Sequence, residues 1–314
     1  MSFWKETRSA PTWKTYIESW MYSYPSKLVD VSNHLIQKKI PPGFSLRLAN
    51  KEDIEQLPEF WTRYFSDSTR CIVPLLHIQK MASKSWTILV VVKDDIVVGS
   101  LVRRWITNLH TKQVLWKKAG IIDYFCIQPS YRKKGIGQLL LSTIHNLTEK
   151  PIQPHLMLLE GLQFAMPPTA SGMFLSKQCT HTNISIREVP LEESENAWKI
   201  CVKGNDVWSD WRENGETSLW NVGGSNCEYV AIWNTFHYSI PNGAKIGIVL
   251  GYSSVDVLYK CTLSLAHGFG VLLVGIPYAE MFHFSGWNAD SPFQWLSYNL
   301  ANGFISGKFP ALCI

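Results

Sequence analysis

The sequence predicts a mixed α/β fold made of two lobes, and three observations support this prediction. The chain has 314 residues, a length that suits two domains of ordinary size better than one. Apolar residues make up 46% of the chain and charged residues 18%, so there is material for packed cores and no signature of disorder. Apolar stretches with strand-like alternation also recur between stretches with apolar residues at helical spacing. We therefore expect helices and strands to be mixed in both halves.

The first elements of the compact part are a strand and two helices. Residues 44–48 alternate as a strand does, and Asn50 or Asp53 can cap a helix that continues through Phe65. A second, short helix is expected over 75–82. These segments open the element order βααβββαβ that we predict for the first half.

Strands dominate the next part of the chain. The runs at 86–92 and 96–106 are separated by a polar turn and predict a hairpin. After a polar tip at 108–112, the segments 114–118 and 120–127 are predicted to be further strands. The first half should therefore contain a strand-rich sheet.

A helix over 136–147 and a strand over 155–160 complete the order predicted for the first half. The charged, sparsely apolar residues near 185–195 mark our boundary between the two lobes. Beyond the boundary, the predicted elements are strands at 229–233, 245–250 and 271–275 and a helical stretch at 255–267.

Composition and terminal segments exclude several classes of protein. The net charge of +5 is modest and spread along the chain, so nucleic-acid binding is not expected. The seven cysteines form no CxxC pair, which argues against a disulfide scaffold or a zinc site and favours reduced thiols in the cytoplasm. No signal peptide or transmembrane segment is expected, because the longest apolar runs are too short. No Walker loop or Ser-His-Asp order stands out.

The segment Arg132–Gly137 carries the pattern R-x-x-G-x-G directly after a predicted strand and at the start of a predicted helix. Glycines let the backbone turn tightly and approach a ligand, and a helix N-terminus favours bound phosphate. Arg132, Lys133 and Lys134 add positive charge to the same turn. A dinucleotide-binding turn would instead follow the first strand of its fold and read G-x-G-x-x-G. The alternative of a plain glycine loop with solvated lysines fits this placement less well.

This pattern and the order of elements resemble the GNAT superfamily of acyltransferases, in which the motif binds the pyrophosphate of acyl-CoA. The segment IDYFCIQPSYRKKGIGQLL is similar to the central motif of the N-myristoyltransferases, approximately I-N-F-L-C-V-x-x-x-L-R-x-K-R-x-A-P. Similar runs occur in the same order elsewhere: FWKETRSAP, PPGF, LSLAHGFGV and DSPFQWLSYNL. The resemblance implies a tandem GNAT-like fold of two fused halves.

The resemblance also implies a domain division and an activity. Residues 1–43, which are punctuated by prolines and include a predicted short helix at 29–37, would form an arm over the acyl-CoA site. Residues 44–185 would be the acyl-CoA half, and residues 186–314 the peptide-binding half. The implied reaction is transfer of myristoyl from acyl-CoA to the N-terminal glycine of client proteins. Myristoyl-CoA would be a co-substrate, and no permanently bound cofactor or metal is expected. We expect the enzyme to act as a cytoplasmic monomer.

Catalysis of this reaction requires an oxyanion site and a base. By resemblance, the main chain of Tyr124 and Phe125 forms the oxyanion site at a bulge. The base would be the terminal carboxylate of Ile314. Asp123, which replaces an Asn of the family, is the alternative base or an anchor for the amine.

Residue by residue, the resemblance assigns further contacts. Asp67 and Asp290 would hold basic residues of the peptide, although Asp290 could equally be an ordinary turn former. The family's Y-T-A-G threonine is Leu159 here, and its K-R-x-A-P is replaced by a loop closer to ordinary GNAT enzymes. The expected acyl-CoA contacts are Phe3, Trp4, Tyr124, Phe125, Cys126, Ile127, Arg132, Lys133, Lys134, Gly135, Ile136 and Gly137.

Two other functions stay open from the sequence. One is a GNAT N-acetyltransferase that acts on a small amine or a protein N-terminus. The other is a catalytically silent protein that binds acyl-CoA or an acylated peptide. Acyl-chain length separates the first from myristoyl transfer, and turnover separates the second from both.

Overall fold

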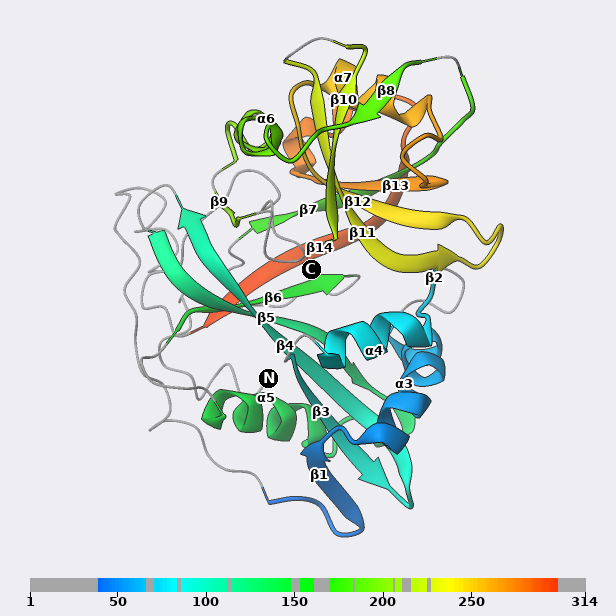
Figure 1. The fold of residues 1–314 in the computed structure, drawn as a ribbon. Helices are drawn as coiled ribbons and strands as arrows, with labels where there is room; N and C mark the ends of the chain where they lie inside the picture. The colour runs from blue at the N-terminus through cyan, green and yellow to red at the C-terminus, as the bar shows by residue number, and fades with distance from the viewer. Residues whose placement is uncertain are drawn as a thin grey trace. The chain divides into compact units, whose positions relative to one another are not determined.

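Two units, each with strands and helices of its own, make up the described part of the chain (Figure 1). The structure is a computed structural model, and it describes residues 39–298 except 66–70, 84–85, 112–114, 148–152, 161–169, 183, 206, 211–215 and 225–226. The first unit contains the described residues up to Ile106, Lys118–Leu158 and residues 297–298, and the second contains Thr107–Lys117 and Leu159–Leu296. The predicted halves at 44–185 and 186–314, one for acyl-CoA and one for the peptide, stay a prediction.

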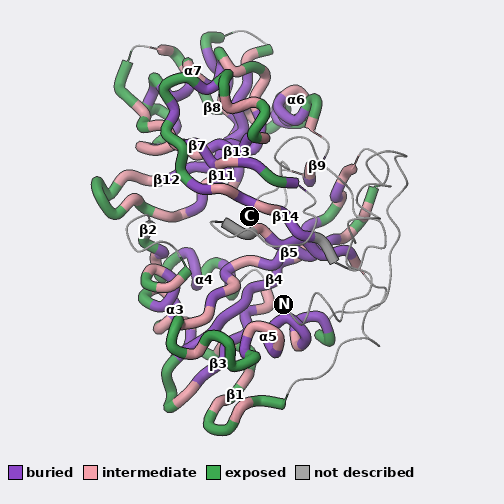
Figure 2. The backbone as a smooth tube through the Cα atoms, turned by 180° about the vertical axis from the view of Figure 1, so that it is seen from behind, coloured by how far each residue is buried: buried purple, intermediate pink, exposed green. Residues whose placement is uncertain are grey.

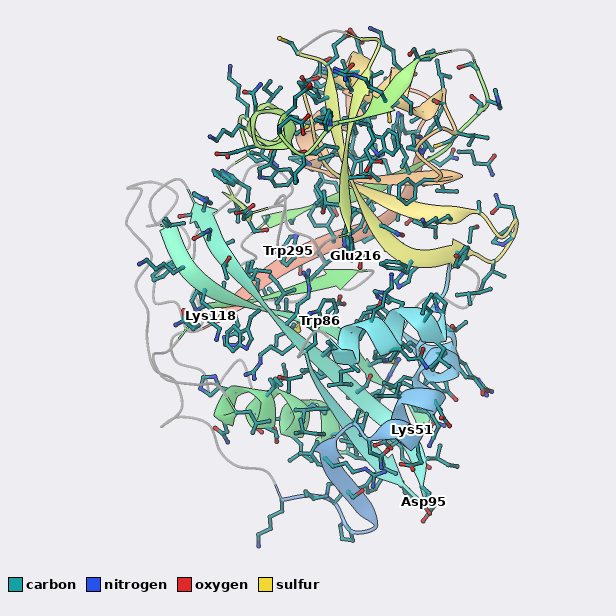
Figure 3. The ribbon with its side chains drawn as sticks, in the orientation of Figure 1. Lys51, Trp86, Asp95, Lys118, Glu216 and Trp295 are labelled. Carbon is teal, nitrogen blue, oxygen red and sulfur yellow. The ribbon has the colours of Figure 1, made fainter. Side chains whose placement is uncertain are left out.

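The sheet of the first unit has the strand order β1-β3-β4-β5-β6. Pairing is antiparallel between β1 and β3 and between β3 and β4, and parallel between β5 and β6. The strands are β1 (Phe44–Leu48), β3 (Thr87–Lys93), β4 (Ile96–Thr111), β5 (Leu115–Ile127) and β6 (His155–Glu160), and a short β2 (Cys71–Ile72) follows the first helix. The turn between β3 and β4 contains Asp95, which is labelled in Figure 3.

Helices cover both faces of this sheet (Figure 1). One face packs against α3 (Lys51–Tyr64) and α4 (Leu75–Ser83) in a core that includes Trp61, Ile78 and Val90. The other face packs against α5 (Ile136–Asn146), whose Ile136 approaches Gly99 of β4. The interior positions of the strands are accordingly buried (Figure 2).

The start of α3 follows directly from the sequence. Asn50 accepts a hydrogen bond from the Asp53 N–H, and Asp53 accepts one from the Asn50 N–H, which completes a capping box. Asp53 is buried, and the Arg47 guanidinium meets its two oxygens at 3.1 and 2.8 Å. The predicted cap is confirmed.

The second unit has the strand order β14-β7-β13-β12-β11-β10-β8. Its described elements, in chain order, are β7 (Ala170–Gln178), β8 (Ile186–Glu188), α6 (Ser194–Cys201), β9 (Val207–Trp208), β10 (Thr217–Val222), β11 (Tyr229–Ser239), β12 (Lys245–Tyr252), α7 (Val255–Thr262), β13 (Val271–Ile276) and β14 (Asn288–Tyr298). Among the described residues of this unit, β12 pairs with β13 in parallel, whereas the pairs β10-β11, β10-β8, β11-β12, β13-β7 and β14-β7 are antiparallel. Val257, Leu258 and Cys261 of α7 face a core with β11 and β13.

The two units repeat one topology. In each, an antiparallel run of strands (β1-β3-β4 and β8-β10-β11) leads to a strand, a helix and a neighbouring parallel strand (β5-α5-β6 and β12-α7-β13). In the second unit, Cys201 of α6 lies against Gly251 of β12, and the core contains α7. The mixed α/β class and the tandem arrangement are confirmed.

Three element predictions are wrong in detail. The described residues of the segments 114–118 and 120–127 belong to one strand, β5 (Leu115–Ile127), and the predicted tip at 108–112 is strand through Thr111. The helix predicted to reach residue 267 ends at Thr262, so the run 263–271 is not helical. There, Ser264 and His267 accept hydrogen bonds from the N–H groups of Ala266 and Phe269, and such local bonds compete with helix.

No helix among the described residues is long and apolar enough to cross a membrane. The helix predicted at 29–37 lies outside the described residues.

Candidate functional site

The backbone of β5 turns left-handed near the end of the strand, at Tyr124, and we call this irregularity the bulge. The φ of Tyr124 is +47°, a left-handed value that is uncommon for a residue with a side chain. The buried Tyr124 ring stacks on Trp61 at 4.0 Å between centroids, and its hydroxyl lies 3.1 Å from His77 Nε2. The Tyr124 carbonyl accepts a hydrogen bond of 3.0 Å from Ser100 Oγ, which in turn accepts one of 2.7 Å from the Trp61 indole N–H. Packing and hydrogen bonds thus hold an unusual conformation in place, as functional sites often require.

Asp123 precedes the bulge and is half-buried. Its Oδ1 accepts a hydrogen bond of 2.6 Å from the Tyr124 N–H. Burial raises the pKa of the Asp123 carboxyl, while the positive charge of Arg104 and the Tyr124 N–H oppose this rise. Arg104 is itself buried and lies over the Trp86 ring, with 5.5 Å from its Cζ to the ring centroid; Trp86 is labelled in Figure 3. The carboxylate therefore occupies a main-chain donor of the bulge.

The turn after β5 is long, exposed and basic. Residues 128–135 separate β5 from α5 and include a short 3-10 helix at Pro129–Tyr131. Lys133 and Gly135 have left-handed φ values of +64° and +83°, and Arg132 through Gly135 are exposed. Arg132 Nε donates a hydrogen bond of 3.0 Å to the Ile127 carbonyl, which fixes the guanidinium beside the end of the strand.

The N-terminus of α5 is open to a ligand. Gly135 is its N-cap and makes no side-chain cap bond, so no side chain of the cap satisfies the first N–H groups. A Cβ built on Gly135 would meet no atom within 4 Å, whereas one on Gly137 would lie 3.1 Å from both Phe125 and Ile127. Gly137 thus lets the helix start close to the bulged strand, while Gly135 leaves space above the turn. This arrangement can bind a phosphate group.

Further positive charge flanks the turn. The Phe44 and Tyr131 rings meet edge to face at 5.5 Å between centroids. Lys93 Nζ lies 5.3 Å from the Tyr131 centroid, and Lys134 Nζ lies 5.0 Å from it. The aromatic pair holds two ammonium groups beside the turn, which strengthens the site for a polyanion.

Cys126 is not a candidate nucleophile. Its thiol is buried, and burial raises its pKa to about 12, so the reactive thiolate is scarce at neutral pH. Among the described residues, no group of three or more His, Cys, Asp or Glu side chains could hold a metal ion.

The structure brings part of the predicted site together. Residues 123–127 and 132–137 form one continuous stretch of bulge, turn and helix start in the first unit. Asp290 is in the second unit, exposed in β14 at a register shift between Ala289 and Ser291, so it is not an isolated loop residue. Phe3, Trp4, Asp67 and Ile314 lie outside the described residues.

Sequence reasoning missed the residues that support the bulge. The contacts to Tyr124 come from Trp61, His77 and Ser100, which are 24 to 63 residues away in the sequence. Of these three, only Ser100 could have been noticed in the sequence, because it is a polar residue within an apolar strand. Arg103 and Arg104 are further polar residues in the same apolar strand, and both are buried.

Comparison with solved structures defines the class of fold as that of the N-acyltransferases. The structure of Saccharomyces cerevisiae N-myristoyltransferase with bound myristoyl-CoA matches with a TM-score of 0.68 and 10% identity, over 95% of this chain and 92% of that chain. A second structure of that enzyme, with myristoyl-CoA and inhibitors, gives 0.67 and 9% identity over 88% and 86%. A putative acetyltransferase from Pyrococcus horikoshii gives 0.56 and 11% identity over 88% and 97%.

At these identities the likeness concerns the fold, and it confirms the predicted GNAT-like and N-myristoyltransferase-like architecture. No protein-family model and no curated protein matches the chain in sequence.

Proposed function

We propose that this protein is an acyl-CoA-dependent N-acyltransferase that transfers a long acyl chain, myristoyl, to the N-terminal glycine of protein substrates. The observation that carries the proposal is the stretch 123–137, in which a left-handed bulge leads into a basic turn and an uncapped helix start. The fold is also that of an enzyme whose solved structure has myristoyl-CoA bound. Acyl transfer to an amine needs both features, one for the thioester and one for the phosphates.

In this proposal the turn at Arg132–Gly137 binds the pyrophosphate of acyl-CoA. Its exposed cations and the N–H groups at the start of α5 offset the phosphate charge. The main chain at Tyr124 and Phe125 receives the carbonyl oxygen as it becomes negative, where one positioned donor contributes about 3 kcal/mol. In the same proposal, Cys126 and Ile127 also contact the acyl-CoA.

The remaining roles belong to the same proposal. Phe3 and Trp4, in the arm at 1–43, cover the CoA end of the donor, and Asp67 and Asp290 hold basic residues of the peptide. The half at 44–185 binds acyl-CoA, and the half at 186–314 binds the peptide. The protein acts as a cytoplasmic monomer without a resident cofactor.

The amine arrives protonated and must lose a proton before it attacks. We propose the terminal carboxylate of Ile314 as the base, with Asp123 as the alternative. The amine nitrogen then attacks the thioester carbon, the C–S bond breaks, and CoA leaves as a thiol once its sulfur is protonated.

Mass spectrometry of a glycine-starting peptide tests the proposed function. The peptide is incubated with a series of acyl-CoAs from acetyl to palmitoyl, and an N-acetylated copy of the peptide serves as the control. Because each buried methylene contributes about 0.8 kcal/mol, myristoyl should be transferred at least 100-fold faster than acetyl at low donor concentration. The control peptide should gain no mass.

Two other outcomes would change the assignment. Equal transfer of acetyl and myristoyl would favour an N-acetyltransferase, a function also supported by the likeness to the Pyrococcus horikoshii structure and by the Gly135-Ile136-Gly137 turn. Acyl-CoA binding without any acylated peptide would favour a catalytically silent binding protein.

The terminal base has its own test, because it depends on a free carboxylate and hardly on the side chain. Extending the chain beyond Ile314 by a few residues should slow single-turnover transfer by about 10²–10⁴-fold, as expected on loss of a general base. Acyl-CoA affinity should not change, and Ile314→Leu should be nearly silent. Normal rates in the extended protein, together with an inactive Asp123→Asn, would assign the base to Asp123.

A further inference from the structure

The Asp123 carboxylate is hydrogen-bonded to the Tyr124 N–H, a donor that the proposed acyl transfer would use. Its Oδ1 lies 2.6 Å from the Tyr124 nitrogen, at the left-handed residue of the bulge. This is the one hydrogen bond that the Asp123 carboxylate makes to the described residues. The structure therefore contains a main-chain donor with an internal anion bound to it.

A second anion cannot use this donor while the carboxylate stays there. The oxygen of a thioester carbonyl becomes negative during attack, and the Tyr124 N–H would have to point at it. Asp123 would then sit beside the developing oxyanion in a half-buried setting, where like charges repel strongly. An ionised Asp123 thus opposes acyl transfer unless a positive charge draws it away or neutralises it.

Arg104 does not do this. Its positive charge favours the ionised form of Asp123, but the carboxylate still bonds to the Tyr124 N–H with Arg104 in place. The missing positive charge has to come from outside the described site. The ammonium group of an incoming amine substrate has the required charge and must approach the bulge to react.

We infer that Asp123 restricts acyl transfer to positively charged amines, because its carboxylate masks the Tyr124 N–H until a substrate ammonium draws it off. This inference rests on the proposed function and deepens it. The ammonium pairs with Asp123, the freed Tyr124 N–H donates a hydrogen bond to the thioester carbonyl oxygen, and the ammonium then gives its proton to the base. The nitrogen lone pair then forms the amide bond, the C–S bond breaks, and the sulfur takes up the proton as CoA leaves.

Water is a neutral nucleophile and does not draw Asp123 away from the bulge. Hydrolysis of bound acyl-CoA, in which water oxygen would form the new bond to the carbonyl carbon, should therefore be slow in the absence of an amine. The device protects the thioester until the correct substrate arrives.

The test measures CoA release from protein loaded with myristoyl-CoA, in single turnover, with and without a glycine-starting peptide. Asp123→Asn removes the charge but keeps an acceptor for the Tyr124 N–H, whereas Asp123→Ala removes both. Glu195→Gln is the matched control, because it neutralises an exposed carboxylate of the second unit. Thermal unfolding shows that each variant is folded.

Without peptide, hydrolysis should increase from wild type to Asp123→Asn to Asp123→Ala. The Asp123→Ala variant should hydrolyse bound myristoyl-CoA about 10²- to 10³-fold faster than wild type, the scale of one oxyanion donor. With peptide, transfer by Asp123→Asn should stay within about tenfold of wild type, since Ile314 remains as the base. Glu195→Gln should match wild type in both assays.

Folded Asp123 variants with unchanged hydrolysis, beside a wild type that acylates the peptide, would overturn the inference and leave the proposed function standing. A wild type that acylates no amine would overturn both. If the variants do not fold, hydroxylamine, a neutral amine, is added to wild-type protein loaded with myristoyl-CoA. We expect hydroxamate to form no faster than the acyl-CoA is hydrolysed. Efficient hydroxamate formation would contradict the inference.

Discussion

The two strand-helix-strand crossovers of the chain share a topology but differ at the turn before the helix. In the first unit, β5 leads through α5 to the parallel strand β6, with Gly120 opposite His155. In the second unit, β12 leads through α7 to the parallel strand β13, with Ile246 opposite Val271. Both β5 and β12 are also irregular near their ends. In β5 the irregularity is the left-handed Tyr124, and in β12 it is a shift in the pairing with β11, opposite Ala231 and Ile232.

The turns themselves are opposites. Residues 128–135 separate β5 from α5, whereas only Ser253 and Ser254 separate β12 from α7. The first turn carries three exposed cations and a glycine N-cap without a cap bond. In the second turn, Ser254 accepts a hydrogen bond of 3.3 Å from the Val257 N–H, and Asp256 adds negative charge to the first helical turn.

The difference separates what the fold provides from what the sequence adds. Both crossovers provide a helix N-terminus next to a strand end, which is a potential anion site. In the second unit Ser254 accepts a hydrogen bond from one of the first N–H groups, and the negative charge of Asp256 adds to the stability of the helix. In the first unit the cap is a glycine that makes no side-chain bond, and the surrounding charge is positive. A binding turn is therefore recognised by the missing cap and the charge, and topology alone does not identify it.

The largest expected effect comes from a negative charge in the first turn. A carboxylate about 5 Å from a phosphate costs about 3 kcal/mol at an effective dielectric constant of about 20, so Gly135→Glu should weaken acyl-CoA binding by about 100-fold or more. Gly268→Glu is the matched control in the second unit, because both glycines have a left-handed φ, +83° and +80°, and open space at the Cβ position. Calorimetry measures both affinities.

Equal affinities of the two glycine variants would place the acyl-CoA site elsewhere and remove the contrast between the turns. Loss of binding in both would show that the backbone strain of a side chain at a left-handed position, and not charge at the site, caused the effect.

A smaller effect is expected when the second turn loses its cap. Ser254→Ala should lower the free energy of unfolding by about 1 kcal/mol, the usual cost of losing an N-cap, and urea denaturation measures this change. Acyl-CoA affinity should stay the same, because the Ser254 hydroxyl caps α7 and makes no other hydrogen bond to the described residues. A selective loss of affinity would instead give the second turn a role in binding.

The sequence predicted most of the first unit because its signals are local. The capping box at Asn50 and Asp53, the apolar run of β3 and the glycine turn before α5 each act within a few residues. The polar Ser264 and His267 looked compatible with a helix, yet they bond to nearby N–H groups and end α7 early.

Strands of the second unit were harder to predict. β7 has the sequence ASGMFLSKQ, and β14 includes Asp290 and Pro292, so neither has strong strand propensity. Their pairing in the sheet decides their conformation, as tertiary context commonly does for strands.

The chemistry of the site was predicted only in part, for a similar reason. The turn at Arg132–Gly137 could be identified from consecutive residues, whereas the support of Tyr124 comes from Trp61, His77 and Ser100 on other elements. The bond between Asp123 and the Tyr124 N–H depends on the left-handed backbone, which no local pattern specifies. Side-chain contacts across a sheet require the fold first.

Hydrogen exchange with and without myristoyl-CoA tests the central contrast most directly. We expect slower exchange of backbone N–H groups in peptides covering 128–140, because the N–H groups at the start of α5 bind phosphate, and no change in peptides covering 253–262. Protection of the second segment, or unchanged exchange over 128–140 while calorimetry shows saturated binding, would contradict the assignment of the first turn as the acyl-CoA site.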